Sequence, residues 1–308
     1  MFKNKAVTLA HISLLMVNLI YGANYTIAKG IMPDIVKPSG FIMIRVLGAS
    51  ALFWLVKSAF KEIPNKKDIY KFAIAGLFGV AGNQLLFFNG LNATSPLNAS
   101  IIMTITPVLV ILISFIVGSE KLNARRITGM VIGFLASVIL IRSSVGDVSV
   151  ITSWQGDVMI FLNALSYSIY LVYVRPLMKI YKPITVITWV FSFGFLFVIP
   201  FGWGEMIEVS WGTLNQKEWL TIGFVVLFTT FFTYLLNVFA LKTVKSSVAS
   251  TYIYLQPVIA LFFSFLFYWY QVYDNVKPNI TWLKVICALT IFMAVYLVSV
   301  EKKVRSST

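Results

Sequence analysis

"ASIIMTITPVLV" occupies residues 99–110, and "ASTYIYLQPVIA" occupies residues 249–260. Both stretches lie in apolar segments that are too long for a strand of a soluble core. Their alanine, serine, proline and valine fall at the same places, 150 positions apart. Proline removes an intrahelical hydrogen bond and kinks a helix. The sequence therefore predicts two bent helices at corresponding places, with kinks at Pro107 and Pro257.

The composition around these stretches is that of a membrane protein. Of the 308 residues, 59% are hydrophobic and 12% are charged, whereas a soluble domain carries about a quarter charged residues. A helix needs roughly 20 mostly apolar residues to cross the hydrocarbon core. The sequence predicts an all-α integral membrane protein with ten spans, at about 7–29, 39–60, 70–91, 96–118, 124–142, 155–175, 183–203, 218–240, 246–270 and 281–300. The single cysteine, Cys287, lies in an apolar run and offers no disulfide.

The positive charges alternate between the two sides of these spans. Most of the 25 lysines and arginines fall near the two termini and in the loops 57–71, 119–126, 175–182 and 242–245. Few fall on the other side, namely Lys29, Lys37, Arg142, Lys217, Lys277 and Lys284. By the positive-inside rule this predicts a multi-pass protein of the inner (plasma) membrane with both termini cytoplasmic. The net charge of +14 is explained by these loops, so no nucleic-acid partner is expected.

The similarity between the two halves extends beyond the proline segments. Asn18, Tyr25, Lys37 and Pro38 match Asn163, Tyr170, Lys182 and Pro183 at an offset of 145. We predict two five-helix repeats, at residues 1–145 and 150–303. Five is odd, so the second repeat enters the membrane the other way up. Inverted repeats are a common plan of secondary transporters, with the substrate site near the midplane between the halves.

Several segments carry a family resemblance. "IYGANYTIAKG" at 20–30, "FIMIRVLGASALFWL" at 41–55, "NGLNATSPLNASIIMTITPVLVILIS" at 89–114 and "GSEKLN" at 118–123 resemble the first repeat of EamA-type members of the drug/metabolite transporter superfamily. "FALKTVKSSVASTYIYLQPVIALFFS" at 239–264 resembles the second. The resemblance covers essentially the whole chain and rests on order and spacing. It implies a ten-helix exporter or facilitator of small metabolites and names no substrate.

Arg45 lies six residues into the second predicted span, and its counterpart in the second repeat is Val190. A cation inside a span usually faces a cavity or a partner. If Arg45 is functional, its guanidinium can hold a carboxylate or phosphate through two hydrogen bonds. The alternative is that Arg45 extends along the helix to the outer headgroups.

Polar and aromatic residues recur at helical spacing on predicted inward faces. A partly apolar metabolite suits aromatic walls with a few amides, and packing between helices is the alternative for each residue. The predicted cavity-lining residues are Asn18, Tyr21, Tyr25, Arg45, Asn83, Gln84, Asn163, Tyr167, Tyr170, Tyr234, Tyr252 and Gln256. Glu120, in "GSEKLN", is expected to pair with Arg125 or Arg126. His11 is expected to pack near the cytoplasmic end of its span.

These observations favour a secondary transporter of small metabolites, such as amino acids or related amphipathic compounds. A flippase for lipid or polyprenyl carriers and a structural membrane subunit remain open alternatives. An enzyme is not expected, because the sequence has no phosphate loop, metal pair or nucleophile–base–acid set. No cofactor or metal is expected, and the expected partners are a small-molecule substrate, membrane lipids and, in a homodimer, a second copy. All carboxylates are expected in loops or in the first turn of a span, which favours a facilitator or exchanger over a proton-driven pump.

Overall fold

The computed structural model describes residues 2–27, 31–32, 35–94, 96–121, 123–144, 153–270 and 281–299. Within these ranges the regular elements are helices and no strand occurs, which confirms the predicted all-α class. Nine described helical segments are long and apolar enough to cross a membrane, and the shorter apolar helix Ile101–Ile116 completes the ten predicted spans.

The helices follow the predicted spans closely. In the first half they are α1 (Phe2–Ile27), α2 (Pro38–Ser58), α3 (Ile69–Gly76), α4 (Asn83–Ala93), α5 (Pro96–Met103), α6 (Thr106–Ile116) and α7 (Ala124–Ser144). In the second half they are α8 (Trp154–Tyr173), α9 (Leu177–Ile180), α10 (Pro183–Ile207), α11 (Gln216–Phe224), α12 (Thr233–Leu241), α13 (Ser246–Thr251), α14 (Gln256–Trp269) and α15 (Trp282–Ser299). Several of these helices are halves of one span, joined by tighter or wider helical turns.

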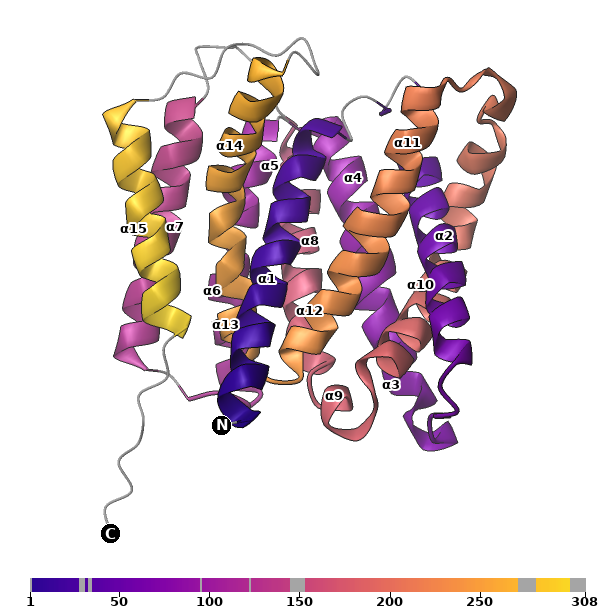
Figure 1. The fold of residues 1–308 in the computed structure, drawn as a ribbon, viewed down its shortest axis with the longest axis horizontal. Coiled ribbons are helices and arrows are strands. Elements are labelled where there is room, and N and C mark those ends of the chain that lie inside the picture. The colour runs from indigo at the N-terminus through magenta and orange to yellow at the C-terminus, as the bar shows by residue number, and fades with distance from the viewer. Residues whose placement is uncertain are drawn as a thin grey trace.

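The helix contacts repeat between the two halves. Figure 1 shows α7 and α15 side by side at one edge of the bundle and α2 and α10 at the other. Helix α4 packs on α8 as α12 packs on α1, and α6 packs on α8 as α14 packs on α1. Helices α1, α4 and α6 of the first half correspond to α8, α12 and α14 of the second half. Each contact therefore occurs twice, with the two halves in opposite roles, as an inverted repeat requires. We call the end that holds the start of α1 and the end of α15 the lower end, and the opposite end the upper end.

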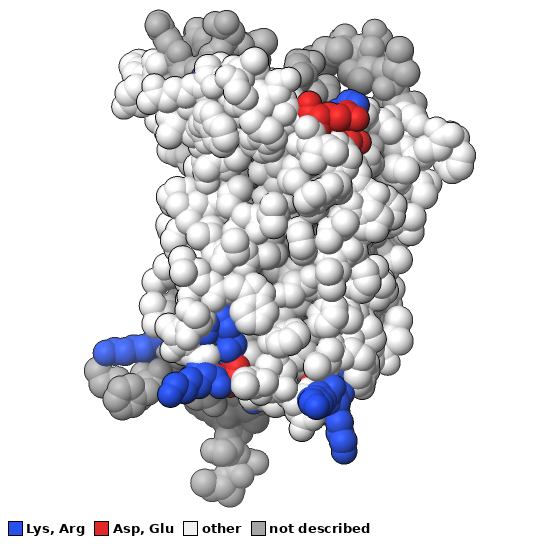
Figure 2. All heavy atoms as spheres, turned by 90° about the vertical axis from the view of Figure 1, so that its right-hand side faces the viewer, with Lys and Arg blue, Asp and Glu red and all other residues white. Residues whose placement is uncertain are grey.

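The outer surface separates an uncharged belt from two charged rims. On the face drawn in Figure 2, lysines and arginines predominate at the lower rim, acidic residues with a basic neighbour lie at the upper rim, and the belt between them carries no charge. Large apolar side chains such as Leu55, Ile116 and Leu289 are mostly exposed on the outer surface. Such a surface is stable against lipid tails but not against water. The fold therefore presents a lipid-facing belt.

Both proline segments are bent, as predicted. Pro107 has no N–H to give to the carbonyl of Met103, and the hydroxyl of Thr106 donates to that carbonyl at 2.7 Å instead. The helix is interrupted there between α5 and α6. In the second half, residues Tyr252–Leu255 form a 3₁₀ turn before Pro257, and the N–H of Gln256 donates to the carbonyl of Ile253. Each bend thus keeps its freed carbonyl satisfied, which apolar surroundings demand.

A second pair of corresponding irregularities was not predicted. Residues Leu77–Gly82 between α3 and α4, and Val225–Phe232 between α11 and α12, are π-helical. They occupy matching places in the two halves. A π-helical turn widens the helix and shifts the carbonyls out of their usual i, i+4 bonds, and such turns often occur at functional sites. Both lie in the middle of their spans.

Helices α2 and α10 are antiparallel and cap one another. Glu205 accepts a hydrogen bond from the N–H of Gly40 at the start of α2, at 2.8 Å. At the other end, Glu62 accepts from the N–H of Lys182 at the start of α10, at 2.9 Å. The first N–H groups of a helix lack internal partners and carry partial positive charge, so a carboxylate stabilises them. Glu205 lies in the last turn of α10, so the expectation that all carboxylates lie in loops or first turns was wrong for this residue.

Candidate functional site

Polar side chains from both halves meet between the two π-helical segments. Arg45 of α2 lies near Tyr21 of α1 and Tyr234 of α12. Tyr234 also lies near Tyr170 of α8 and Gln84 of α4. Tyr167 lies near three of these tyrosines. We call this group the central cluster, and its members are Tyr21, Arg45, Gln84, Tyr167, Tyr170 and Tyr234.

Arg45 is the charged member of the central cluster. Its side chain is buried, with 5% of its surface exposed, so it does not extend to the headgroups as the alternative reading supposed. Its Nε–H donates to the Thr230 hydroxyl at 3.1 Å. Its guanidinium carbon lies 5.6 Å from the ring centre of Phe41 and 5.1 Å from that of Phe88. Cation–π contacts of this kind offset about 0.5–2 kcal/mol of the cost of burial.

The π-helical segment of the first half is held by donors from the second half. The Tyr234 hydroxyl donates to the carbonyl of Gly79 at 3.2 Å, and the Ser166 hydroxyl donates to that of Phe78 at 2.8 Å. The amide of Asn163 donates to the carbonyl of Asn83. These bonds satisfy backbone groups that lipid could not satisfy. Asn163 therefore joins two helices, which is the packing role that the sequence left open for it.

The ring of Tyr170 lies directly against the same segment. A Cβ atom at Gly79 would come within 2.3 Å of this ring. Glycine is therefore required for the close approach of α8 to the π-helical turn. The ring of Tyr167 stacks beside that of Tyr170, with their centres 6.0 Å apart.

Several buried polar atoms around the cluster have no well-formed hydrogen bond to any described residue. They are both amide atoms of Gln84, the hydroxyl of Tyr170, and the amide oxygens of Asn163 and Asn237. An unsatisfied buried polar atom costs about 1–3 kcal/mol. Few occur in a native structure without a reason, and an ordered water or a bound ligand can supply the missing partner. Their concentration here marks the cluster as the candidate substrate site.

Two members of the cluster keep accessible surface although they lie deep among the helices. Tyr21 and Tyr167 are each partly exposed, while their neighbours Arg45, Gln84 and Tyr170 are buried. Asn83, whose side-chain oxygen lies 3.4 Å from the Tyr234 hydroxyl, is also partly exposed. Space therefore adjoins these side chains inside the bundle.

The remaining predicted residues lie around the cluster or apart from it. Gln256 donates to the amide oxygen of Asn18 at 3.0 Å, which ties the second kink to α1 one turn below Tyr21. Tyr252 lies apart, with its hydroxyl 2.8 Å from Nδ1 of His11. The side chain of Tyr25 lies outside the described part of the chain.

Two further polar residues support the cluster, and of these the sequence analysis missed Thr230, whereas Asn237 stands out as a polar residue of the eighth predicted span beside Tyr234. Thr230 receives the hydrogen bond of Arg45 and itself donates to the carbonyl of Val225 at 2.8 Å. Asn237 donates to the Tyr167 hydroxyl at 2.6 Å. The threonines Thr229, Thr230 and Thr233 stand together in an otherwise apolar run, and this was the available signal. Threonine is common in helices of membrane proteins, however, so the signal was weak.

Comparison with known proteins shows the family to which this chain belongs. A model of the EamA-like transporter family matches residues 8–142 and again residues 154–300. The chain belongs to the EamA-like transporter family. The uncharacterized transporter YyaM of Bacillus subtilis (strain 168) is 26% identical over 83% of this chain and 85% of its own length. The uncharacterized transporter YoaV of the same organism is 24% identical over 94% and 98%. A solved crystal structure aligns over 96% of both chains with a TM-score of 0.73 at 14% identity.

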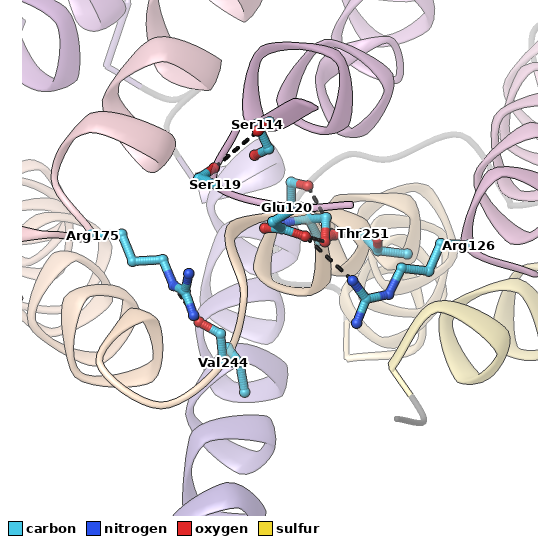
Figure 3. A network of polar contacts seen from close by, with 9 residues as sticks. Ser114, Ser119, Glu120, Arg126, Arg175, Val244 and Thr251 are labelled. Carbon is cyan, nitrogen blue, oxygen red and sulfur yellow. Dashed lines mark hydrogen bonds and ion pairs between the residues drawn. The ribbon is translucent and has the colours of Figure 1, made fainter. Parts of the chain in front are cut away.

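This EamA-like transporter is thus a multi-pass membrane protein, and the central cluster lies between its two halves. Outside the cluster, Figure 3 shows a buried carboxylate that joins the halves at the lower end. Glu120 accepts hydrogen bonds from the N–H and the hydroxyl of Ser247, and it pairs with Arg126 at 3.4 Å. The expected pairing with Arg126 is therefore confirmed, and the bonds to Ser247 are additional.

The position of Ser247 explains why Glu120 is buried. Helix α13 begins at Ser246 after Lys245, whose side chain makes no capping hydrogen bond. Glu120, from the other half of the transporter, supplies the carboxylate that a capping aspartate would normally supply. The nearby Arg175 donates to the carbonyl of Val244 at 3.1 Å, just before the same helix (Figure 3). This network fixes the loop after α6 to the start of α13.

A hollow of 390 Å³ at the upper end is a weaker candidate for a substrate site. It is lined by Ile35, Glu208, Ser210, Thr213, Leu214 and Glu218. Glu208 is paired with Lys37 at 2.7 Å, and this hydrogen bond raises the pKa of Lys37. Glu218 forms a capping box with Asn215 at the start of α11. Both carboxylates therefore have structural partners. No cluster of metal-ligating side chains occurs among the described residues.

Proposed function

We propose that this transporter is a secondary carrier of small amphipathic metabolites, such as amino acids and related compounds, and that the central cluster binds them. The supporting observation is the group of unsatisfied buried polar atoms among the aromatic rings, between the π-helical turns of both halves. A site at the junction of inverted repeats can be opened to either side when one half moves against the other. We place the protein in the inner (plasma) membrane with both termini cytoplasmic, because the basic loops lie at the lower end.

The direct test compares metabolites in medium and cytosol. Cells that produce the transporter are compared with cells that produce the variant Gln84→Leu/Tyr170→Phe at equal membrane abundance. We expect a small set of amphipathic compounds to redistribute across the membrane only with the unaltered protein. Equal profiles in the two strains would exclude the central cluster as a transport site.

A flippase of lipid or polyprenyl carriers is the second candidate, and it predicts a different result. Its cargo stays in the membrane, so the soluble metabolites would be unchanged while the distribution of a lipid between the leaflets would change. The small polar cluster favours a compact soluble substrate, since the large apolar tail of a lipid needs an open lateral path.

A further inference from the structure

Arg45 is a buried cation without a carboxylate partner among the described residues. The hydroxyls of Tyr21 and Tyr234 lie near it, and the ion pairs Lys37–Glu208, Lys71–Asp68 and Arg126–Glu120 lie elsewhere in the chain. Of its five N–H donors, Nε–H alone forms a hydrogen bond to a described residue. A cation inside a membrane helix is costly unless it faces a cavity or a partner. An anionic ligand that reached the terminal nitrogens would offset this cost.

The geometry points to a ligand of one negative charge, a small monocarboxylate, bound by the guanidinium of Arg45. This inference rests on the proposed function and narrows its substrate class from amphipathic metabolites in general to monocarboxylates without an ammonium group. A carboxylate matches the planar fork of the two terminal nitrogens and forms two parallel hydrogen bonds with it. The binding of one carboxylate makes the sum of the charges on ligand and central cluster zero.

The same charge count disfavours two other classes. A phosphate monoester carries nearly two negative charges at neutral pH, so one charge would stay uncompensated beside a single arginine. A zwitterionic amino acid brings an ammonium group, and the described part of the cluster holds no carboxylate to pair with it. Uncompensated charges are costly in such a buried site. The unsatisfied amide oxygens of Asn163 and Asn237 suit a neutral donor on the ligand, such as a hydroxyl group.

The rings beside Arg45 define what surrounds the bound carboxylate. Phe41 and Phe88 lie against the guanidinium, edge to face with their centres 5.7 Å apart. The Tyr234 ring packs edge-on against the ring of Phe191, with their centres 4.8 Å apart. These rings exclude water from the charged pair and leave its hydrogen bonds strong. The carbon skeleton of the ligand would then lie among aromatic rings.

The experiment measures binding to the purified, full-length transporter in detergent, with compounds that share one skeleton and differ in charge. The probes are 3-phenylpropanoate, phenylalanine, 3-phenylpropanamide and 3-phenylpropylamine, and a shorter set contains 4-methylpentanoate, leucine and 4-methylpentanamide. The readouts are the concentration-dependent shift of the melting temperature and a dissociation constant from the change in intrinsic protein fluorescence. We expect at least one acid to bind at least tenfold more tightly than the amide, amine and amino acid of its set.

Three variants separate recognition of charge from folding. Arg45→Lys keeps the charge but loses the planar fork, so the acid should bind about tenfold more weakly and should still bind more tightly than the amide. Arg45→Gln loses the charge, so the acid and the amide should bind equally. Lys61→Gln removes one positive charge at an exposed position just after α2, and it should bind as the parent does.

The possible outcomes are distinct. Tighter binding of the amino acids or amines than of the acids, an unchanged acid preference in Arg45→Gln, or no binding of either acid would overturn the inference. None of these outcomes bears on the metabolite comparison, which uses no chosen probe, so the proposed function stands or fails separately.

Discussion

Tyr170 and Tyr254 are both almost fully buried, but their hydroxyl groups are in opposite situations. The hydroxyl of Tyr254 donates to the carbonyl of Met130 at 3.0 Å. The hydroxyl of Tyr170, in the central cluster, has no hydrogen-bond partner among the described residues. A buried hydroxyl without a partner destabilises the empty protein and becomes useful only when a ligand supplies the partner. The two tyrosines therefore form a matched pair for separating transport from stability.

We predict that Tyr170→Phe leaves the free energy of unfolding unchanged or raises it by up to about 1 kcal/mol, and lowers transport about fivefold, because the ligand loses one hydrogen bond. Tyr254→Phe should lower the free energy of unfolding by about 1 kcal/mol and leave transport unchanged. Chemical unfolding in detergent and substrate uptake into liposomes measure the two effects. If Tyr170→Phe destabilised the protein without changing transport, this hydroxyl would have only a structural role.

At the residue scale, the sequence predicted those members of the central cluster whose chemistry is conspicuous; their role in binding stays a prediction. An arginine, amides and tyrosines inside apolar spans are costly unless they face one another, so Gln84 and Tyr234 could be selected from the pattern alone. Tyr252 fitted the same pattern but lies beside His11, since helical spacing gives the face of a helix and not its depth. Thr230 was missed because a threonine can satisfy its hydroxyl within its own helix and so needs no partner elsewhere.

At the element scale, the proline bends were predictable and the π-helical segments were not. Proline prevents one particular hydrogen bond wherever it occurs. The π-helical turns at Leu77–Gly82 and Val225–Phe232 have no residue in common that forces them. They persist because tertiary donors such as Ser166 and Tyr234 satisfy carbonyls of the first segment. A sequence does not reveal donors that arrive from a distant helix.

The first bend allows a double-mutant test of its chemistry. Thr106→Val removes the hydroxyl that serves the Met103 carbonyl and should lower the free energy of unfolding by about 1 kcal/mol. In the Pro107→Ala background, the new N–H of residue 107 can donate to the Met103 carbonyl. Thr106→Val should then change the free energy of unfolding little. Thr104→Val, whose hydroxyl donates to Ile101, is the control and should show no such coupling. If Thr106→Val lowered the free energy of unfolding equally in both backgrounds, the Thr106 hydroxyl would not be the group that compensates for the missing N–H of Pro107.

The capping of α13 by Glu120 gives a prediction about how the halves are joined. Glu120→Gln keeps the shape of the side chain and removes its charge, so the ion pair with Arg126 and the interaction with the start of α13 both weaken. We expect the free energy of unfolding to fall by about 2 kcal/mol, as for a hydrogen bond to a charged group. Ser119→Ala alters the same loop but removes no contact with Ser247, so it should lower the free energy of unfolding by less. Protease accessibility of residues 119–126 should rise only in Glu120→Gln.

At the scale of the whole molecule, the two-repeat helical architecture was predictable because the hydrophobic lengths, the charge asymmetry and the repeated proline segments agree. The same agreement predicts the orientation. Reporter fusions after Lys67, Arg125, Lys179 and Lys245 should be cytoplasmic, and fusions at Asp147 and Glu208 should be external. Phosphatase and fluorescent-protein fusions at each site report opposite sides, so a mixed pattern would contradict both the number of spans and the inversion.

The positions of the acidic residues lead to a prediction about energy coupling. Proton-driven carriers commonly use carboxylates or histidines inside the membrane. In the described part of the chain, the carboxylates lie near the two ends of the bundle and engage helix starts or neighbouring side chains, at Glu62, Asp68, Glu120, Asp157, Glu205, Glu208 and Glu218. The ring of His11 is paired with Tyr252, away from the central cluster.

We therefore predict a facilitator or exchanger that is driven by the gradient of its own substrate. The substrate for the test is the compound identified by the metabolite comparison, loaded at equal concentration inside and outside liposomes. An imposed pH gradient should then cause no more accumulation with the transporter than in protein-free liposomes, whereas a substrate gradient should drive rapid flux and counterflow. Accumulation that requires the transporter, follows the pH gradient and disappears with an uncoupler would show proton coupling. Asp157, which accepts a hydrogen bond from Thr94 at the upper end of α8, would then be the first carboxylate to replace, because it lies deepest in its span.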